Sequence, residues 1–254
     1  MNVRTYGTDE RLGFCRDYLL KKNVCSVSEI ILLPIPTTRD GVTISGIDKM
    51  PSEISGEPNS VTAVVGYGIP QSFRESFANS GLITVDVSLD EAFTEENATL
   101  TANGTVGKIL TLENAAPTDL SIGIIGYGRI GKRLLRLLLF LGARVSLFTS
   151  KESIMNELCA LGISAMPYDV LGKKEVCREL LELDIIINTA PDSIMSDEVI
   201  EGLNTTKIIE LASGDNFPIG RNVIRLSGIP AKMYPRSAGR VLADSVLRML
   251  GEQT

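Results

Sequence analysis

Three glycines, Gly126, Gly128 and Gly131, stand in the spacing G-x-G-x-x-G directly after the apolar run 121–125. The segment that follows them has the apolar spacing of an amphipathic helix. In such a strand–turn–helix unit, the first glycine makes a tight turn and the second lets a pyrophosphate approach the backbone, while the third lets the helix pack closely on the strand. Free N–H groups at the helix start then face the phosphates. The motif predicts a Rossmann-type dinucleotide-binding site, with contacts from Gly126, Gly128, Arg129, Ile130 and Gly131.

A second glycine pair, Gly66 and Gly68, also follows an apolar run. The residues after it are Ile69 and Pro70, and no third glycine stands at the spacing that a dinucleotide site requires. We therefore interpret this pair as a turn that joins a strand to a helix.

Short apolar runs alternate with helix-like segments along the 254 residues, a length sufficient for two domains of ordinary size. The runs lack the strict alternation of a half-exposed sheet and are typical of parallel sheets covered on both faces. The predicted fold class is α/β, with two doubly wound parallel-sheet domains, of which the C-terminal one has the Rossmann fold. We expect a flavodoxin-like domain over residues 1–95, joined by a C-terminal helix 237–254, and a dinucleotide-binding domain with a linking helix over residues 96–236.

Local patterns add three expectations about individual elements. The linking helix 90–114 is expected to break at Gly104 and Gly107, because glycine costs about 1 kcal/mol in a helix interior. The run 41–46 predicts a short strand, and the apolar stripe near the C-terminus predicts a last helix over residues 237–250.

The chain carries a net charge of −6, so it lacks the basic character that a nucleic acid or an anionic membrane surface requires. It begins without an apolar signal core and has no uncharged run of membrane-spanning length, which predicts a cytoplasmic protein. The four cysteines form no C-x-x-C pair and are interpreted as free thiols. Neither a metal site nor a disulfide framework is expected.

The chain contains no histidine. Imidazole is the most common general base near neutral pH, because its pKa lies there. Any mechanism that needs an imidazole, including the Ser-His-Asp triad, is therefore excluded.

The second strand of the predicted Rossmann unit ends at Phe148, and Thr149, Ser150 and Lys151 follow it. A site that prefers NAD usually has a carboxylate here, which binds the ribose 2′-hydroxyl and repels a 2′-phosphate. Hydroxyls and a cation at this place favour NADP over NAD as the cofactor. The alternative is that Lys151 is a solvated residue at a helix start and that Glu152 binds the ribose.

Ligands of such sheets bind outside the carboxyl ends of the strands. Small residues stand at the ends of the later predicted strands, where they leave room for a nicotinamide and offer backbone hydrogen bonds. The cofactor contacts expected here are Asn188, Thr189, Ala190, Pro191, Ala212 and Gly228. Loop chemistry alone also explains some of these residues.

Several segments along the chain resemble those of the dipicolinate synthase A-subunit family, which is related to the cofactor domains of D-2-hydroxyacid dehydrogenases. The segment 30–41 is similar to the family's "ILP…TT-x-x-G", and the segment 97–105 is similar to its "N-x-x-P-T-x-E-G". The segments 187–191 and 210–213 resemble "INT-x-P" and "DLAS", and the more specific C-terminal run 228–242 resembles "GLPG…APKTAGQIL".

The chain also departs from the family pattern. Residues 212–217 read ASGDNF where the family has "ASRPGG", so an arginine and a glycine pair are missing. Leu100 and Asn103 replace the linker proline and glutamate, and the N-terminal region is shortened after its first helix. The chain thus resembles a divergent relative of this family.

The resemblance implies an oxidoreductase that converts a dihydrodipicolinate-type precursor to dipicolinate during sporulation, with a flavoprotein-like B-subunit for its partner. The substrate would be a small dicarboxylate, bound in a cleft between the halves, and aromatisation would drive hydride loss to the cofactor. The cations considered for the two carboxylates are Arg39, Arg129, Lys232 and Arg236. The catalytic candidates are Arg236, with Ser213 or Tyr234 (or a water) for the proton.

Two alternatives stand beside this interpretation. One is an oxidoreductase for another small carboxylic acid, although the Arg/Glu/His set of ordinary hydroxyacid dehydrogenases is incomplete without histidine. The other is an NAD(P)-binding sensor or partner subunit without catalysis, which the altered segment 214–217 favours. A homodimer is compatible with the sequence, which does not specify one.

Overall fold

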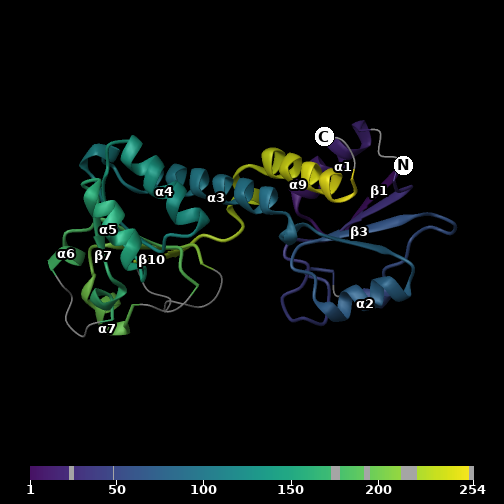
Figure 1. Ribbon diagram of the computed structural model, residues 1–254, viewed down its shortest axis with the longest axis horizontal. Coiled ribbons are helices and arrows are strands. Elements are labelled where there is room, and N and C mark those ends of the chain that lie inside the picture. Colours follow the sequence, from purple (N-terminus) through teal and green to yellow (C-terminus); the bar gives the residue numbers. More distant parts are fainter. Residues whose placement is uncertain (23–25, 48, 173–177, 192–194, 213–221, 252–254) are drawn as a thin grey trace. The chain divides into compact units, whose positions relative to one another are not determined.

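The computed structural model describes residues 1–22, 26–47, 49–172, 178–191, 195–212 and 222–251. Contacts divide the chain into two compact units (Figure 1). The first unit comprises residues 1–100 and 230–254, and the second comprises residues 101–229. The chain therefore returns to its first unit at the C-terminus. Residues 96–100 and 230–236 were expected in the dinucleotide-binding domain, but they belong to the first unit.

The first unit contains a four-stranded parallel sheet with its strands in chain order. A flavodoxin-like sheet has the order 2-1-3-4-5, and without its outer strand 2 it gives the order seen here. The N-terminal region was expected to be shortened after its first helix. The missing outer strand would lie there, between the end of α1 at residue 21 and the start of β2 at residue 29. The strands are β1 (Asn2–Thr5), β2 (Glu29–Leu32), β3 (Thr62–Gly66) and β4 (Ile83–Asp86).

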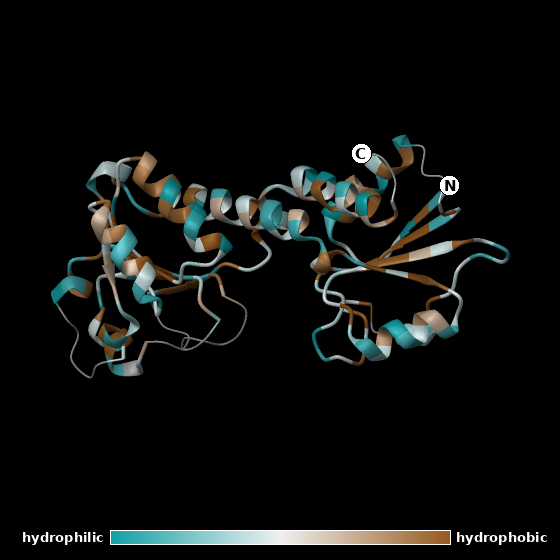
Figure 2. Ribbon diagram, in the orientation of Figure 1, coloured by the Kyte–Doolittle hydropathy of each residue, from teal (hydrophilic) through white to brown (hydrophobic). Residues whose placement is uncertain are grey.

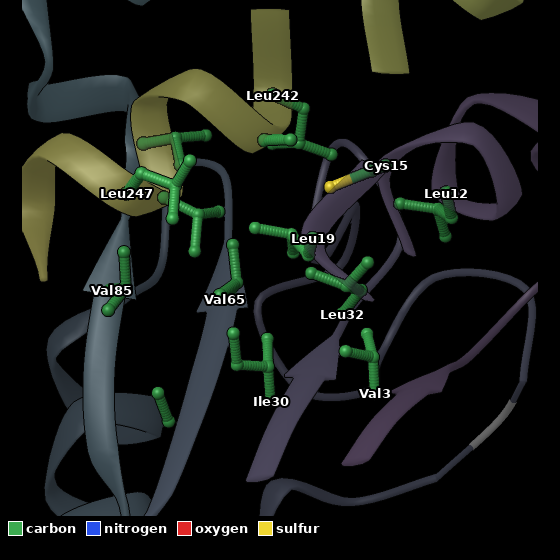
Figure 3. Packing of buried hydrophobic residues seen from close by; sticks show 14 of the residues in the cluster. Val3, Leu12, Cys15, Leu19, Ile30, Leu32, Val65, Val85, Leu242 and Leu247 are labelled. Carbon is green, nitrogen blue, oxygen red and sulfur yellow. The ribbon is translucent and has the colours of Figure 1, made fainter. Parts of the chain in front are cut away.

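Helices pack on both faces of this sheet. On one face, α1 (Glu10–Lys21) and α9 (Pro235–Met249) bury leucines such as Leu19 and Leu242 against Ile30 and Val65 of the strands (Figure 3). On the other face, α2 (Gln71–Asn79) buries Phe73 and Phe77 against the sheet, with their two rings edge to face to each other. Apolar burial on both faces explains the continuous apolar runs in the sequence.

The pair α1 and α9 packs exceptionally closely at Gly239. A β-carbon at this position would lie 2.6 Å from the Cβ of Phe14 and 2.7 Å from the carbonyl oxygen of Arg11. Only glycine lets the two helix backbones approach to this distance.

The second unit contains a six-stranded, entirely parallel sheet. Its order is β7-β6-β5-β8-β9-β10, which is the 3-2-1-4-5-6 order of a Rossmann fold when β5 is counted as strand 1. The predicted fold class is thereby confirmed. The strands are β5 (Ser121–Ile125), β6 (Arg144–Phe148), β7 (Ser164–Met166), β8 (Ile185–Asn188), β9 (Lys207–Glu210) and β10 (Val223–Arg225).

Two apolar clusters cover the two faces of this sheet. One joins the C-terminal part of α3 (Glu91–Leu112) with α4 (Arg129–Phe140) and α5 (Glu152–Ala160), and the other joins α6 (Arg178–Leu181) with α7 (Asp197–Gly202). Figure 2 shows these helices with mixed apolar and polar faces. Shorter helices are α8 (Ile229–Met233) and the 3₁₀ turns η1 (Pro51–Glu53), η2 (Val87–Leu89), η3 (Pro117–Asp119) and η4 (Tyr168–Val170).

Two local expectations are wrong. Helix α3 continues without a break through Gly104 and Gly107, because Ala102, Val106 and Ile109 bury an apolar stripe that offsets the cost of the glycines. The run 41–46 forms no strand beyond a single bridge between Ile44 and Lys49.

The cause of the missing strand is the carboxylate of Asp40. It accepts hydrogen bonds from the backbone N–H groups of Val42 and Thr43, at 2.8 Å each. These donors are therefore not available for a β-ladder. Within the described segments, no helix is both long and apolar enough to cross a membrane.

Candidate functional site

The turn after β5 has the geometry that the glycine motif predicts. Gly126 has a φ of +98°, a left-handed conformation that favours glycine, and its N–H donates to the carbonyl of Phe148 at 2.9 Å. A β-carbon at Gly131 would strike the carbonyl group of Gly126, so the helix start lies directly against the turn. Around Gly128 no atom lies within 4 Å of an added β-carbon. The turn thus leaves an open place at its second glycine and none at its third.

Helix α4 begins at this turn with a positive environment. Gly128 is its N-cap and provides no side-chain hydrogen bond to the helix start, whose first N–H groups have no acceptor within the helix. Arg129 is exposed in the first helical position, and the ammonium of Lys132 lies 5.3 Å from the centre of the Tyr127 ring. The helix start and these cations favour an anion such as a pyrophosphate.

The end of β6 presents a different arrangement for each of its three predicted residues. The hydroxyl of Thr149 is buried and accepts a hydrogen bond from the N–H of Lys151 at 3.3 Å, so it shapes the turn into α5. Ser150 and Lys151 are exposed, and Lys151 is the N-cap of α5. Glu152 is exposed as well, in the first turn of the same helix.

The loop after β8 is attached to the glycine turn. Thr189 donates from its hydroxyl to the carbonyl of Ile125 at 2.8 Å, and its backbone N–H donates to the same oxygen at 2.9 Å. A β-carbon at Gly126 would lie 2.6 Å from the Thr189 hydroxyl oxygen. Ala190 is buried in this loop, and Pro191 is exposed.

Glu210, at the end of β9, opens the segment 210–213 that resembles "DLAS", but it was not among the residues predicted for the site. Glu210 is only 3% exposed, and both of its carboxylate oxygens lie 3.1 Å from the amide nitrogen of Asn188. One oxygen also accepts from the N–H of Ala212 at 2.8 Å. The sequence does carry a signal for this carboxylate, because a glutamate at the end of an apolar strand needs hydrogen-bond donors when it is buried.

The remaining predicted residues are distributed over both units. Gly228 is exposed with a φ of +64°, just before α8, and Ala212 is half-buried. Tyr234 is the N-cap of α9, and Arg236 is exposed in the first turn of that helix, in the first unit. Ser213 and the segment 214–217 lie outside the described residues. The catalytic assignment of Arg236, Ser213 and Tyr234 stays a prediction.

The second glycine pair forms a strand-to-helix turn, as interpreted, and its amides have an internal acceptor. The buried carboxylate of Asp86 accepts from the N–H groups of Gly68 and Ile69 at 2.9 Å each, and it pairs with Arg74. An anion of a ligand would need the same donors. The chain's own carboxylate therefore occupies the place of a phosphate in this turn.

Arg39 lies in the loop that follows β2, beside a turn closed by hydrogen bonds to Asp40. The Asp40 carboxylate accepts from the hydroxyl and N–H of Thr43, the N–H of Val42 and the hydroxyl of Thr38. These hydrogen bonds hold the pKa of Asp40 well below its usual range. The Arg39 side chain is exposed on this turn. Among the described residues, no group of three or more Cys, Asp and Glu side chains is arranged to hold a metal.

The sheet order, the glycine turn and the uncapped helix start together define a protein of the Rossmann dinucleotide-binding class. Among known proteins, the chain is similar to the A-subunit of dipicolinate synthase from Bacillus subtilis (strain 168). The two are 24% identical over 250 residues, which cover 90% of this chain and 82% of that protein. The resemblance stated from the sequence motifs is thereby confirmed. No protein-family model matches the chain.

Solved structures show the same likeness in the fold. The dipicolinate synthase A-subunit of Bacillus halodurans superposes with a TM-score of 0.73 at 19% identity, over 99% of this chain and 98% of that one. An L-alanine dehydrogenase superposes with a TM-score of 0.58 at 12% identity, over 98% of this chain and 88% of that one. The chain thus has the two-domain fold of dehydrogenases over nearly its whole length.

Proposed function

We propose that the protein is an NAD(P)-dependent oxidoreductase that oxidises a dihydrodipicolinate-type precursor to dipicolinate. The observation that carries the proposal is the glycine turn, open at Gly128 and closed at Gly131, in a chain similar from end to end to the dipicolinate synthase A-subunit. The turn supports nucleotide binding, and the resemblance supports the substrate.

The residues present fit a dinucleotide. The pyrophosphate would lie against Gly128 and the first N–H groups of α4, with Arg129 beside it. The adenine ribose would lie near Ser150 and Lys151, whose exposed hydroxyl and ammonium support NADP over NAD. Ala190, Pro191, Ala212 and Gly228 would border the other half.

The reaction removes a hydride and a proton from a dihydropyridine ring and leaves an aromatic pyridine dicarboxylate. The nicotinamide group supplies the hydride acceptor when it is bound. The protein has to hold two carboxylates and orient the ring, for which Arg39 and Arg236 are the candidates. Without histidine, Tyr234, Ser213 or a water would accept the proton.

Further parts of the proposal rest on the resemblance alone. A companion B-subunit is inferred from the name of the relative, which designates one component of dipicolinate synthase. Action in the cytoplasm of a sporulating cell is inferred from the family resemblance of the sequence segments.

The test is calorimetric binding of NADP and NAD to the purified protein, followed by incubation with a dihydrodipicolinate-type precursor and chromatography for dipicolinate. We expect tighter binding of NADP and formation of dipicolinate with stoichiometric cofactor reduction. The absence of product with either cofactor, whether or not a B-subunit is present, would contradict the enzymatic proposal. The absence of nucleotide binding would contradict the cofactor proposal as well.

A second candidate is a nucleotide-binding partner subunit without catalysis. The observation that favours it is the sequence GDNF at residues 214–217, where the related family has an arginine and a glycine pair. Nucleotide binding without hydride exchange on any small carboxylic acid would support this candidate over an oxidoreductase.

A further inference from the structure

Glu210 and Asn188 are direct neighbours across two parallel strands. Their Cα atoms are register partners in the pairing of β8 with β9, and each residue is the last one of its strand. Both side chains are almost fully buried, at 3% and 1% exposure. The pair therefore lies at the carboxyl edge of the sheet, where ligands of Rossmann folds bind.

The side-chain amide of Asn188 makes its hydrogen bonds to other groups of the protein. Its nitrogen donates to the Glu210 carboxylate and to the carbonyl of Ala190, at 3.1 Å in each case. Its oxygen accepts from the N–H of Ala190 at 3.1 Å. Both hydrogens of the amide are thus engaged, and Asn188 orders the loop that follows it.

Glu210 also fixes the backbone of Ala212 with the same carboxylate. The N–H of Ala212 donates to it at 2.8 Å, so the backbone after β9 is attached to the side chain at its end. Hydrogen bonds to a carboxylate are stronger than bonds between neutral groups, and burial removes competing water. Glu210 thereby connects Asn188, at the end of β8, with Ala212, just after the end of β9.

These residues at the ends of β8 and β9 belong to one half of the expected cofactor site. The 2′-position of the adenine ribose is recognised at the end of the second Rossmann strand, here β6. The pyrophosphate lies at the end of β5, and the dinucleotide crosses the sheet at the point where the strand order reverses. Given the order of β5, β8 and β9 in the sheet, the nicotinamide half of a bound dinucleotide would lie beyond β5, over the ends of β8 and β9.

From this geometry we infer that Glu210 is a positioning residue for the nicotinamide half of the cofactor. It acts through the side chain of Asn188 and the backbone of Ala212, which it holds in place, and the adenine half does not depend on it. The inference rests on the proposed function, since it requires that the protein binds NAD(P).

The test compares a whole dinucleotide with its adenine half on the variant Glu210→Gln. The probes are NADP and 2′,5′-ADP, or NAD and ADP if the unaltered protein binds NAD more tightly. We expect the variant to lose on the order of tenfold in affinity for the dinucleotide, the effect of a lost charge-assisted hydrogen bond. Its affinity for the adenine half should stay within about twofold.

The matched control is Glu29→Gln, which removes another buried carboxylate. Glu29 is 1% exposed in the first unit and accepts from Thr62 and from the N–H of Glu57. This variant should lower the melting temperature and leave the ratio of the two affinities unchanged. If Glu210→Gln does not fold, Asn188→Ser removes the other partner of the Asn188–Glu210 hydrogen bond. This variant should change the ratio of dinucleotide affinity to adenine-half affinity in the same direction.

The two measured affinities distinguish the positioning role of Glu210 from the proposed function. A selective loss of dinucleotide affinity supports the positioning role. Equal losses for the dinucleotide and the adenine half, or no loss for either, would overturn that role and leave the proposed function intact. Failure of the unaltered protein to bind any of these nucleotides would overturn the proposed function and the positioning role together.

Discussion

Gly131 lies so close to Gly126 that a β-carbon on residue 131 would strike the carbonyl group of residue 126. Gly128, between them, has open space in the same direction. The three glycines of one motif therefore have separable roles. Gly131 is needed for folding of the turn, whereas the proposed function requires the open space at Gly128 for a ligand.

Replacement of Gly128 by valine should weaken nucleotide binding and leave the fold intact. Its φ of −82° suits any residue, and nothing obstructs a side chain there until a pyrophosphate approaches. We expect binding of NADP or NAD to fall by at least about tenfold, measured by calorimetry, because a branched side chain blocks close approach to the backbone. An unchanged affinity would show that no pyrophosphate lies at this turn.

Replacement of Gly131 by alanine should instead destabilise the second unit. The added carbon meets backbone, which cannot move aside as a flexible side chain can. We expect a loss of about 1–3 kcal/mol in the free energy of unfolding, measured by denaturant titration. A variant as stable as the unaltered protein would contradict the close contact.

The close approach of α1 and α9 gives a matched pair of glycine variants. Gly239→Ala should destabilise the first unit by about 1–3 kcal/mol, because its β-carbon would lie 2.7 Å from the Arg11 carbonyl oxygen. Gly13→Ala, in α1, meets no atom within 4 Å and should stabilise the protein by about 0.5–1 kcal/mol through helix propensity. Thermal melts of the two variants should shift in opposite directions.

Reversal of the charge at Lys151 should change the cofactor preference. A carboxylate at the end of β6 repels a 2′-phosphate and can bind a free 2′-hydroxyl. We expect Lys151→Glu to weaken NADP binding relative to NAD by roughly tenfold, measured by competition. The exposed Lys21→Glu, with the same change in net charge, should leave the preference unchanged.

The stability of the first unit should depend on pH through Glu29. Burial alone would raise the pKa of this carboxyl, but hydrogen bonds from the N–H of Glu57, from Thr62 and from Arg4 lower it below its ordinary value. A lowered pKa contributes stability above the unfolded-state pKa near 4.5, and this stability is lost as the pH falls through the folded-state pKa.

The corresponding measurement is denaturant unfolding of the unaltered protein and Glu29→Gln between about pH 7 and pH 3. The unaltered protein should be more stable at neutral pH, and the difference should narrow below about pH 4. A difference that does not vary with pH would indicate that Glu29 contributes only through its shape and neutral hydrogen bonds.

Local features were predictable because they depend on neighbouring residues in the chain. The glycine spacing 126-128-131 is readable from the sequence, since a turn and the helix start after it need only a few consecutive residues. The strand and helix alternation follows in the same way from short-range apolar periodicity. The absence of histidine constrains the chemistry without any structure.

Tertiary structure decided what depends on residues far apart in the chain. Parallel pairing of β8 with β9 brings Glu210 against Asn188, and two packed helices bring Gly239 against Phe14. The strand expected over residues 41–46 is missing for a local reason instead, since Asp40 accepts from the N–H groups of Val42 and Thr43. Packing, by contrast, keeps α3 continuous through Gly104. Sequence periodicity reports which residues are apolar, whereas these contacts depend on which buried group finds which partner, and only the folded chain determines that.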